Sequence, residues 1–410
     1  MTHLRLELAD GTAPVLREAG HSPAPAVHPL ASGSHLRTVH EFCDFLALET
    51  EWRRLETGCQ SHRNIFQTFD WLKTWAEVYS AAPGSQELHV ILGYRDSRLV
   101  FAWPLMRTRS GPLTILRWMS EPLSQYGDVL IASGECAKAW MTATLIQLRS
   151  TPGVDAIRLR HVRCDAAATP FLHINFRNAR LAEQAPWLDL TRFADEAAYE
   201  ARYTSSQRKR RKKIRKALED AFGPVAFTVL KPGHAGDLAI DQAIAEKSEW
   251  IEERGRQNRA LSGPGLSTFL KRLARSQDGA MDLVVTALTA GGKPVSWEIG
   301  LRHAGTHFAF ITSHVNALTD YSPARLHMDL SQRHALNHGM RAFDLMLPHD
   351  AYKDSWSSGH TDTADFHLPL SAGGWAYGVI YLERLRPMLR HAYYRMSPGL
   401  LRLLKPIVGH

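Results

Sequence analysis

Apolar residues recur along the chain with two different periods. Three- and four-residue steps over residues 40–56 and again over 69–80 predict helices. The next segment, ELHVILGYRDSRLVFAWPLMRTR, is apolar on both sides of a polar break at 95–98, which predicts a β-hairpin. Residues 10–35 are rich in Pro, Ala, Gly and Ser and have no such period, so we expect residues 1–35 to form a flexible leader.

The same order of predicted elements occurs a second time. After another helical region comes MDLVVTALTAGGKPVSWEIGLRHAGTHFAFI, in which Gly291 and Gly292 predict the hairpin turn. Two copies of one α/β unit would account for a chain of 410 residues. We therefore expect an N-terminal lobe over 36–195 and a C-terminal lobe over 196–370.

A strongly basic helix is predicted at the start of the second copy. Thr204 and Gln207 have the spacing of a capping box, and Gly223 with Pro224 predicts the end of the helix. Residues 202–216 carry nine Lys or Arg and no acid. Two interpretations stay open: a solvated basic face, or a site for an anionic partner such as a phosphate, a nucleotide, a lipid headgroup or an acidic polymer. The anion-binding candidates are Arg208, Arg211, Lys212 and Arg215.

The net charge of +8 is concentrated in two segments. Residues 371–410 carry six basic residues and one acid, and with the basic helix they hold more than the whole excess. A general nucleic-acid surface is therefore not indicated, and we expect no sequence-specific nucleic-acid partner. The tail itself has apolar residues at helical spacing together with aromatics and arginines. Either it packs as a helix across the two lobes, or it contacts a membrane surface peripherally.

Other classes of protein are disfavoured by what the sequence lacks. No apolar run approaches the length of a membrane-spanning helix, and the N-terminus does not resemble a signal peptide, so we expect a cytoplasmic protein. The four cysteines are too far apart for a CxxC motif. Signatures of dinucleotide binding, P-loops, zinc proteases and serine hydrolases are missing. His303 and His307 have no partner at ligand spacing, so no metal is expected.

The most informative stretch lies between residues 308 and 326. A predicted strand leads into a loop, and a helix then begins at Ser322 and Pro323. Proline suits the first helical turn because its missing N–H would have no partner there. The free N–H groups of this turn, with the helix dipole behind them, make a plausible cradle for a pyrophosphate.

At these residues the sequence resembles a known family, the GNAT-type acetyltransferases grouped with the CelD and BcsL proteins of bacterial cellulose and exopolysaccharide biosynthesis. Those proteins are distant relatives of the tandem-GNAT FemABX peptidyltransferases. The likeness follows the order of motifs over about 290 residues. It rests on Phe66-Gln67-Thr68, Trp71, Pro104-Leu105, the run 122–128, the basic helix 208–216, Trp250, the run 313–316, the run 321–326, Gly339, Phe343-Asp344, Tyr352-Lys353 and Trp356.

The resemblance implies an α/β, tandem GNAT-like fold of two mixed-sheet lobes with helices on both faces. Acetyl-CoA would enter as co-substrate where the strand before the Ser-Pro loop splays from its neighbour. The residues implied in holding it are Ile311, Thr312, Ser313, Ser322, Ala324, Arg325 and Leu326. An amine would then attack the thioester directly, with Asp344 as the first candidate base, Tyr352 and Lys353 as acid or orienting groups, and Glu298 in reserve.

Several alternatives stay open. Asp344 could instead be a structural carboxylate that caps the next loop or pairs with Lys353. The family usually has glycine where this chain has Ala324, and a glycine-containing turn at Pro348-His349. The leading hypothesis is an N-acetyltransferase acting on an amino sugar or polysaccharide precursor, with contacts to the inner membrane or to polysaccharide synthesis machinery. The others are a FemABX-like ligase that uses aminoacyl-tRNA, and a non-catalytic scaffold that binds an anionic nucleotide or a partner.

Overall fold

The computed structural model describes residues 30–59, 64–79, 86–179, 183–254, 258–276 and 279–395. Most of the predicted leader lies outside these residues, and from Ser34 the chain already belongs to the first strand. The predicted tail is described as far as residue 395. Among the described helices, none combines the length and the apolar character that crossing a bilayer requires.

The strands of both lobes join in one mixed sheet of 14 strands. Its hydrogen-bonded order is β1-β2-β3-β4-β6-β14-β8-β13-β12-β11-β10-β9, with β5 beside β3 and β7 beside β14. The strands are β1 Ser34–Val39, β2 Glu87–Arg95, β3 Arg98–Ser110, β4 Leu113–Trp118, β5 Leu130–Ile131, β6 Ala156–Arg163, β7 Arg177–Asn178, β8 Glu183–Asp189, β9 Val225–Leu230, β10 Met281–Ala290, β11 Lys293–His303, β12 Thr306–His314, β13 Ala342–Asp344 and β14 Gly359–Pro369.

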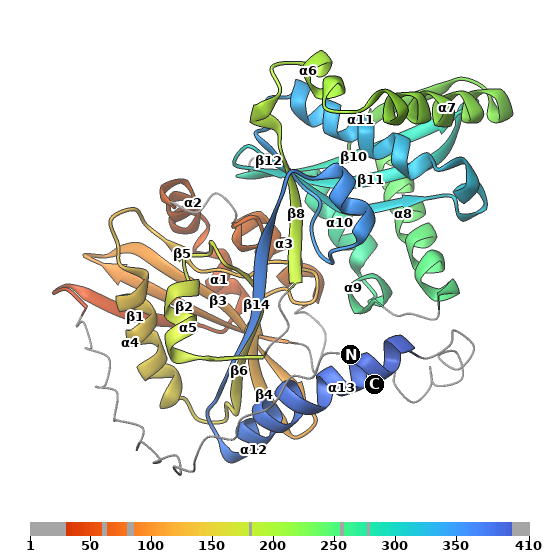
Figure 1. Ribbon diagram of the computed structural model, residues 1–410. Helices are drawn as coiled ribbons and strands as arrows, with labels where there is room; N and C mark the ends of the chain where they lie inside the picture. The colour runs from red at the N-terminus through yellow and green to blue at the C-terminus, as the bar shows by residue number, and fades with distance from the viewer. Residues whose placement is uncertain are drawn as a thin grey trace, which may run out of the picture.

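Helices cover both faces of this sheet (Figure 1). In the C-terminal lobe, α6, α7 and α11 lie over one face, and α8 and α10 lie over the other. The α-helices are α1 Phe42–Leu46, α2 Glu49–Gly58, α3 Phe69–Tyr79, α4 Ala137–Arg149, α5 Thr169–Asn175, α6 Glu196–Ala201, α7 Ser205–Phe222, α8 His234–Glu253, α9 Arg259–Ser262, α10 Leu266–Arg275, α11 Pro323–Asn337, α12 Ala372–Trp375 and α13 Arg386–Arg395. Short 3-10 helices are η1 Ile65–Gln67, η2 Leu190–Arg192, η3 Asn316–Tyr321 and η4 Ala351–Trp356, and η5 Ala376–Leu385 is a π-helix.

One order of elements is used twice. An antiparallel hairpin, a third strand, a helix and a parallel strand follow one another as β2-β3-β4-α4-β6 and again as β10-β11-β12-α11-β13. Both predicted hairpin turns are confirmed, the first at residues 96–97 and the second at 291–292. The four turn residues have positive φ, the conformation that matches the right-handed twist of the flanking strands.

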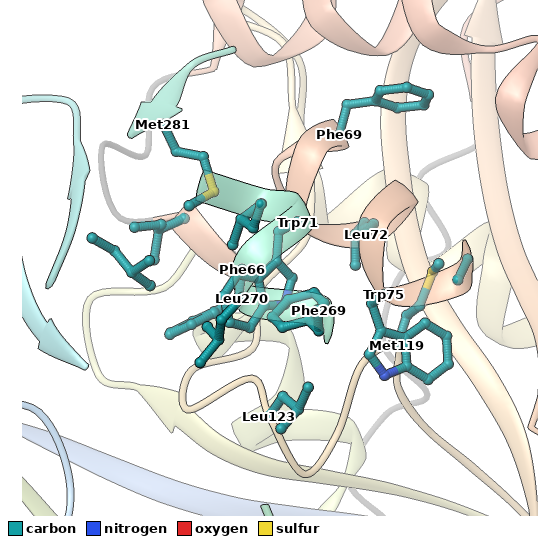
Figure 2. Close-up of a cluster of buried hydrophobic side chains, with 14 of the residues drawn as sticks. Phe66, Phe69, Trp71, Leu72, Trp75, Met119, Leu123, Phe269, Leu270 and Met281 are labelled. Atoms are coloured by element: carbon teal, nitrogen blue, oxygen red, sulfur yellow. The ribbon is translucent and has the colours of Figure 1, made fainter. Parts of the chain in front are cut away.

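The two lobes are connected through the sheet and through a shared core. β14 pairs with β8 over residues 359–363 and with β6 over 363–369, so a strand from the end of the second lobe extends into the first. In addition to this connection through the sheet, α3 packs on α10 (Figure 2). The ring of Trp71 stands edge-on to Phe66 and to Phe269, with centroids 4.8 Å apart in both pairs. Burial of these large rings, which stabilises by roughly 2 to 3 kcal/mol for each side chain, fixes the lobes to one another.

Candidate functional site

The neighbouring parallel strands β12 and β13 separate shortly after they meet. They pair only from Thr306 to Phe308, whereas β12 continues to His314. On its other side β12 keeps pairing with β11, with a register shift that leaves Phe310 as an extra, bulged residue. A bulge bends the strand that carries it. The backbone edge of β12 beyond Phe308 is therefore open towards a gap, which is the splay that the resemblance implies.

The first of two cavities lies in this gap. It has a volume of 140 Å³ and is called the β12 cavity below. Residues 309–312 of β12 line one side, and Leu345, Leu347 and Pro348 line another. Three charged side chains reach it, those of Lys247, Asp350 and Lys353. Of the family-implied cofactor residues, Ile311 and Thr312 lie here, while Ser313 is buried and its carbonyl accepts from Ser296.

The second cavity, of 330 Å³, lies between α7, the start of α11 and η4. This α11 cavity is lined by Arg325 and Leu326, two more of the implied cofactor residues, and by Gln207, Arg210 and Arg211 of α7. Tyr352 lines both cavities, so they adjoin at this side chain. The α11 cavity is thus lined by cations and lies beside a helix N-terminus. The smaller β12 cavity adjoins it and lies beside an open strand edge.

The start of α11 has the geometry that the sequence predicts. Pro323 is the first helical residue, and Ser322 before it has the left-handed φ of 52°. The N–H of Arg325 donates to the Ser322 carbonyl at 3.1 Å. Ala324 is an ordinary helical residue with negative φ, because the left-handed position is at Ser322. The alanine in place of the usual glycine therefore causes no backbone strain here.

The basic helix α7 is capped as predicted, since Thr204 and Gln207 form both bonds of the capping box. Its four anion-binding candidates have different surroundings. Arg211 lines the α11 cavity, where it also pairs with Asp329. The other three, Arg208, Lys212 and Arg215, do not line that cavity: the first donates to the Tyr203 carbonyl, the second is exposed, and the third pairs with Glu219.

Arg210 was not singled out from the sequence, although it faces the α11 cavity. The nine cations are so dense that composition does not separate one face of the helix from another. Helical spacing would have helped, because Gln207, Arg210, Arg211 and Ile214 recur at three- and four-residue steps and all four line the cavity.

Asp344, the first candidate base, is buried and fully engaged. Its carboxylate accepts from the Tyr126 hydroxyl at 3.0 Å, from Arg163 Nη1 at 3.0 Å and from the Met346 N–H at 2.8 Å. It lines neither of the two cavities. All three donors belong to the protein itself, so the carboxylate is already occupied by contacts within the fold. These surroundings favour the structural alternative, in which Asp344 caps the following loop, and its partner is Arg163 and not Lys353.

Tyr352 and Lys353 are placed differently from each other. Partial burial raises the pKa of Tyr352 to about 12, so its hydroxyl is a hydrogen-bond donor at neutral pH. Lys353 Nζ donates to the carbonyls of Leu345, Met346 and Pro348 at 2.8 to 2.9 Å. Burial lowers the pKa of Lys353 to about 8, but these three acceptors favour the ammonium form. Lys353 therefore fastens the loop that lines the β12 cavity.

Asp350 is the carboxylate that sequence reasoning missed. It is exposed, lines the β12 cavity, and stands in the same lining as Lys247 and Lys353. Its position two residues before Tyr352 was the available signal, since it shares the short segment that the resemblance marks. Within this lining it is the one carboxylate.

Glu298, the reserve base, belongs to a buried polar layer beneath α11. His307 Nε2 donates to its carboxylate at 2.8 Å, and His327 of α11 bridges Thr286 and Ser296 at 2.8 and 3.0 Å. Burial acts to raise the pKa of Glu298, but the hydrogen bonds and the neighbouring imidazole rings, with His307 first among them, together outweigh burial and the pKa is lowered. Burial lowers the pKa of His327 to about 4, so this ring stays neutral. The layer positions α11 on the sheet and does not reach the cavities.

The histidines considered for a metal do not form a site together. His307 is buried against Glu298, and His303 donates to the Ala280 carbonyl at 2.7 Å. Within the described residues, one group of three possible metal ligands has its ligand atoms within 4.8 Å of each other: His349, Asp354 and His360. Asp354 accepts from both rings, at 2.8 and 3.0 Å, so the three groups satisfy one another without an ion.

Comparison with known proteins agrees with this geometry. Residues 205–354, which contain α7, α11 and η4, match the family model of the acetyltransferase (GNAT) domain. The part of the chain that resembles a GNAT domain is therefore the C-terminal lobe. The match supports the prediction that the chain is an acyltransferase. No sequence among the curated proteins is similar enough to serve as a relative.

Solved structures extend the comparison to both lobes. FemX aligns with a TM-score of 0.55 at 11% identity, over 83% of this chain and 98% of FemX. The C-terminal domain of a putative lysylphosphatidylglycerol synthetase from Agrobacterium fabrum aligns with a TM-score of 0.50 at 10% identity, over 83% and 95% of the two chains. A tandem GNAT protein from the clavulanic acid biosynthesis pathway gives a TM-score of 0.47 at 12% identity, over 82% and 99%.

At these identities the likeness concerns the fold alone. The predicted α/β, tandem GNAT-like fold is confirmed, with the addition that β8 and β14 join the two lobes in one sheet. The narrower likeness to the CelD and BcsL proteins stays a prediction.

Proposed function

We propose that this protein is an N-acetyltransferase that uses acetyl-CoA and acts on an amino sugar of an exopolysaccharide or of its precursor. The observation that carries the proposal is the junction of the two cavities at Tyr352, within the gap between β12 and β13. One cavity suits the phosphates of the donor and the other suits the reacting groups. Acetyl-CoA would supply the activated acyl group as a thioester.

The residues of the α11 cavity fit a pyrophosphate. Arg210 and Arg325 line it beside Arg211, and the first turn of α11 adds backbone N–H groups with a positive dipole. Arg211 Nε and Nη1 are buried without a hydrogen-bond partner among the described residues, although Nη2 pairs with Asp329. Unsatisfied buried donors of this kind favour binding of an anion. The open edge of β12 at residues 309–312 would then accompany the pantetheine arm towards the smaller cavity.

The chemistry asked of the chain is positioning and proton transfer. When the amine attacks the thioester carbonyl, a C–N bond forms, the C–S bond breaks and the amine loses a proton. In this proposal Asp350 takes that proton, directly or through a water molecule, and the Tyr352 hydroxyl donates towards the leaving sulfur; both residues line the β12 cavity. Lys353 keeps their loop in place through the three carbonyls that it binds.

The amino-sugar acceptor comes from the family resemblance. One feature of the β12 cavity supports a polar acceptor. Gln125 lines this cavity, and its side-chain oxygen is buried without a hydrogen-bond partner among the described residues. A hydroxyl or amine of a sugar would satisfy it.

A second candidate is a FemABX-like ligase, which moves an aminoacyl group from tRNA to an acceptor. The exposed basic face of α7 favours this alternative, because a nucleic-acid backbone binds through such cations. The side chains that form the exposed face are those of Lys209, Arg210, Lys212, Lys213, Arg215 and Lys216.

Adjacent residues of α7 provide the test. Arg210 lines the α11 cavity, whereas Lys209 is exposed outside it. Isothermal titration with acetyl-CoA should give binding that Arg210→Glu weakens by at least about tenfold and Lys209→Glu leaves unchanged. If both variants instead reduce salt-dependent retention of tRNA equally, and acetyl-CoA does not bind, the ligase is favoured. If folded wild-type protein binds neither, the site is not catalytic and the scaffold hypothesis remains.

A further inference from the structure

Exposed large apolar side chains are concentrated at one place on the molecule. In the described part of the chain twelve such side chains are exposed, and six of the twelve lie between residues 375 and 389. The most exposed are Met388 at 69% and Leu389 at 60%. The six are Trp375, Ile380, Tyr381, Leu385, Met388 and Leu389, and together they are called the tail patch below. Single exposed apolar residues are ordinary, but a group of this size indicates an interaction surface.

The helical geometry separates this patch from a buried stripe. In the π-helix η5, whose hydrogen bonds run from residue i to residue i+5, residues four and five apart lie on the same side of the helix. Tyr377 and Leu382 are five apart and pack with Ile115 and Ala156 on the sheet of the first lobe. Trp375, Ile380 and Leu385 have the same spacing and are exposed. The segment therefore buries one stripe and presents a second, apolar one to its surroundings.

The segment is held firmly enough to act as a fixed surface. Glu383 accepts from Arg177 Nε at 2.6 Å and from His367 at 2.9 Å. Close backbone packing holds its first turn, because a Cβ added at Gly374 would lie 1.7 Å from the Asp155 carbonyl oxygen. The tail patch is consequently exposed while the helix that carries it is docked.

Charge decides between the partners that an apolar face could take. Glu383 is the sole acid in residues 371–410, and Arg177 and His367 already engage it. The basic residues of the same segment are Arg384, Arg386, Arg390, Arg395, Arg402 and Lys405. A second copy placed on the patch would bring like charges together, whereas an anionic lipid surface would complement them. Trp375 and Tyr381 also suit the headgroup region, where aromatic rings with a polar edge concentrate.

We propose that the tail patch docks this protein on an anionic membrane surface, with the apolar stripe of residues 375–389 inserted between headgroups and the arginines next to lipid phosphates. The docking is peripheral, because the rest of the segment stays packed on the first lobe. It does not depend on acyl transfer, so the proposal stands or falls separately from the proposed function.

The test is co-sedimentation of the full chain with vesicles of phosphatidylcholine alone and with about 30 mol% phosphatidylglycerol added. Binding is expected to the anionic vesicles, and it should weaken in about 0.5 M NaCl because salt screens the lipid charge. Leu385→Glu with Met388→Glu should lower the partition coefficient at least tenfold. Ile146→Glu is the matched control, since Ile146 is an apolar side chain of α4 that is 56% exposed, and it should have no effect.

Other outcomes would overturn the proposal. Equal binding to both kinds of vesicle would show that lipid charge does not contribute to docking. No binding to either kind would show that the tail patch does not dock on a membrane. Analytical ultracentrifugation tests the alternative that the tail patch binds a second copy of the chain. That alternative would hold if the protein does not bind vesicles, forms a dimer, and becomes monomeric in the variant Leu385→Glu with Met388→Glu. Circular dichroism of the variant keeps the result interpretable, because substitution of exposed residues should leave the fold intact.

Discussion

Substitution of asparagine for aspartate should have different effects at two carboxylates near the site, Asp344 and Asp350. Asp344→Asn is expected to damage stability, whereas Asp350→Asn is expected to damage catalysis. Asp344 is 3% exposed, and its charge is paired with Arg163, which is itself buried. Asp350 is exposed and lines the β12 cavity. The pair of variants separates a buried structural charge from a group that can exchange protons with a substrate.

The size of the stability effect follows from the contacts. Loss of one partner of a buried ion pair costs about 3 to 5 kcal/mol. Arg163 keeps bonds to Asp165 at 2.9 Å and to Thr361 at 3.1 Å, which places Asp344→Asn near the lower end, at about 3 kcal/mol. An asparagine would in addition turn its N–H₂ group towards another donor, Tyr126 or the Met346 N–H. The exposed Asp350→Asn should change stability by no more than about 0.5 kcal/mol.

Urea unfolding and steady-state kinetics together make the measurement. Asp344→Asn should lower the unfolding midpoint by about 1 M urea. At a temperature where this variant is folded, its turnover should stay within about threefold of wild type, because a carboxylate outside the cavities is not asked to move a proton. Asp350→Asn should keep the wild-type midpoint and its affinity for acetyl-CoA, and lose about 10² to 10⁴-fold in kcat.

One result would refute this reasoning. An Asp344→Asn protein with the wild-type unfolding midpoint and a turnover reduced more than about 10²-fold would restore Asp344 as the base. Unchanged turnover in Asp350→Asn would remove the exposed carboxylate from the mechanism.

Three further outcomes are expected. Tyr352→Phe should reduce kcat by about 10²-fold with little change in acetyl-CoA affinity, since only the hydroxyl is removed; parallel losses in both quantities, measured by kinetics and calorimetry, would point to a packing role. The hydrogen bond from its arginine partner lowers the pKa of Glu383 from 4.5 to about 2, so the stability it contributes is present above pH 4.5 and lost as the pH falls towards 2. Thermal unfolding at pH 3 and pH 6 should therefore differ less in Glu383→Gln than in wild type. Gly374→Ala places a methyl group against the Asp155 carbonyl and should release the tail helix to proteolysis, whereas Gly58→Ala, with open space around it, should not.

The sequence was sufficient wherever a structure depends on near neighbours. The hairpin turn at 291–292 needs positive φ at both positions, which glycine adopts freely, and the turn at 96–97 falls in the polar break between two apolar runs. The capping box of α7 and the proline at the start of α11 are likewise complete within four residues of sequence. Such features are set by backbone sterics and local hydrogen bonds, so composition and spacing reveal them.

Other features of the site depend on segments far apart in the chain. Asp344 meets Arg163 and Tyr126 across 181 and 218 residues, and no local pattern announces a buried ion pair of that kind. Because a carboxylate's role depends on its donors and its burial, the sequence could identify Asp344 as notable without distinguishing a base from a structural charge.

By itself, the sequence determined the repeated α/β unit, the basic helix, the Ser-Pro start of α11 and the likeness to GNAT acetyltransferases. Tertiary structure alone decided that β14 bridges the lobes, that Arg210 and not Arg208 faces the α11 cavity, and that Asp350 is the accessible carboxylate. The physical reason is the same in each case. The spacing of hydrophobic residues determines which face of a helix or strand is buried. Which polar groups line the same cavity depends on how elements that are far apart in the sequence pack together.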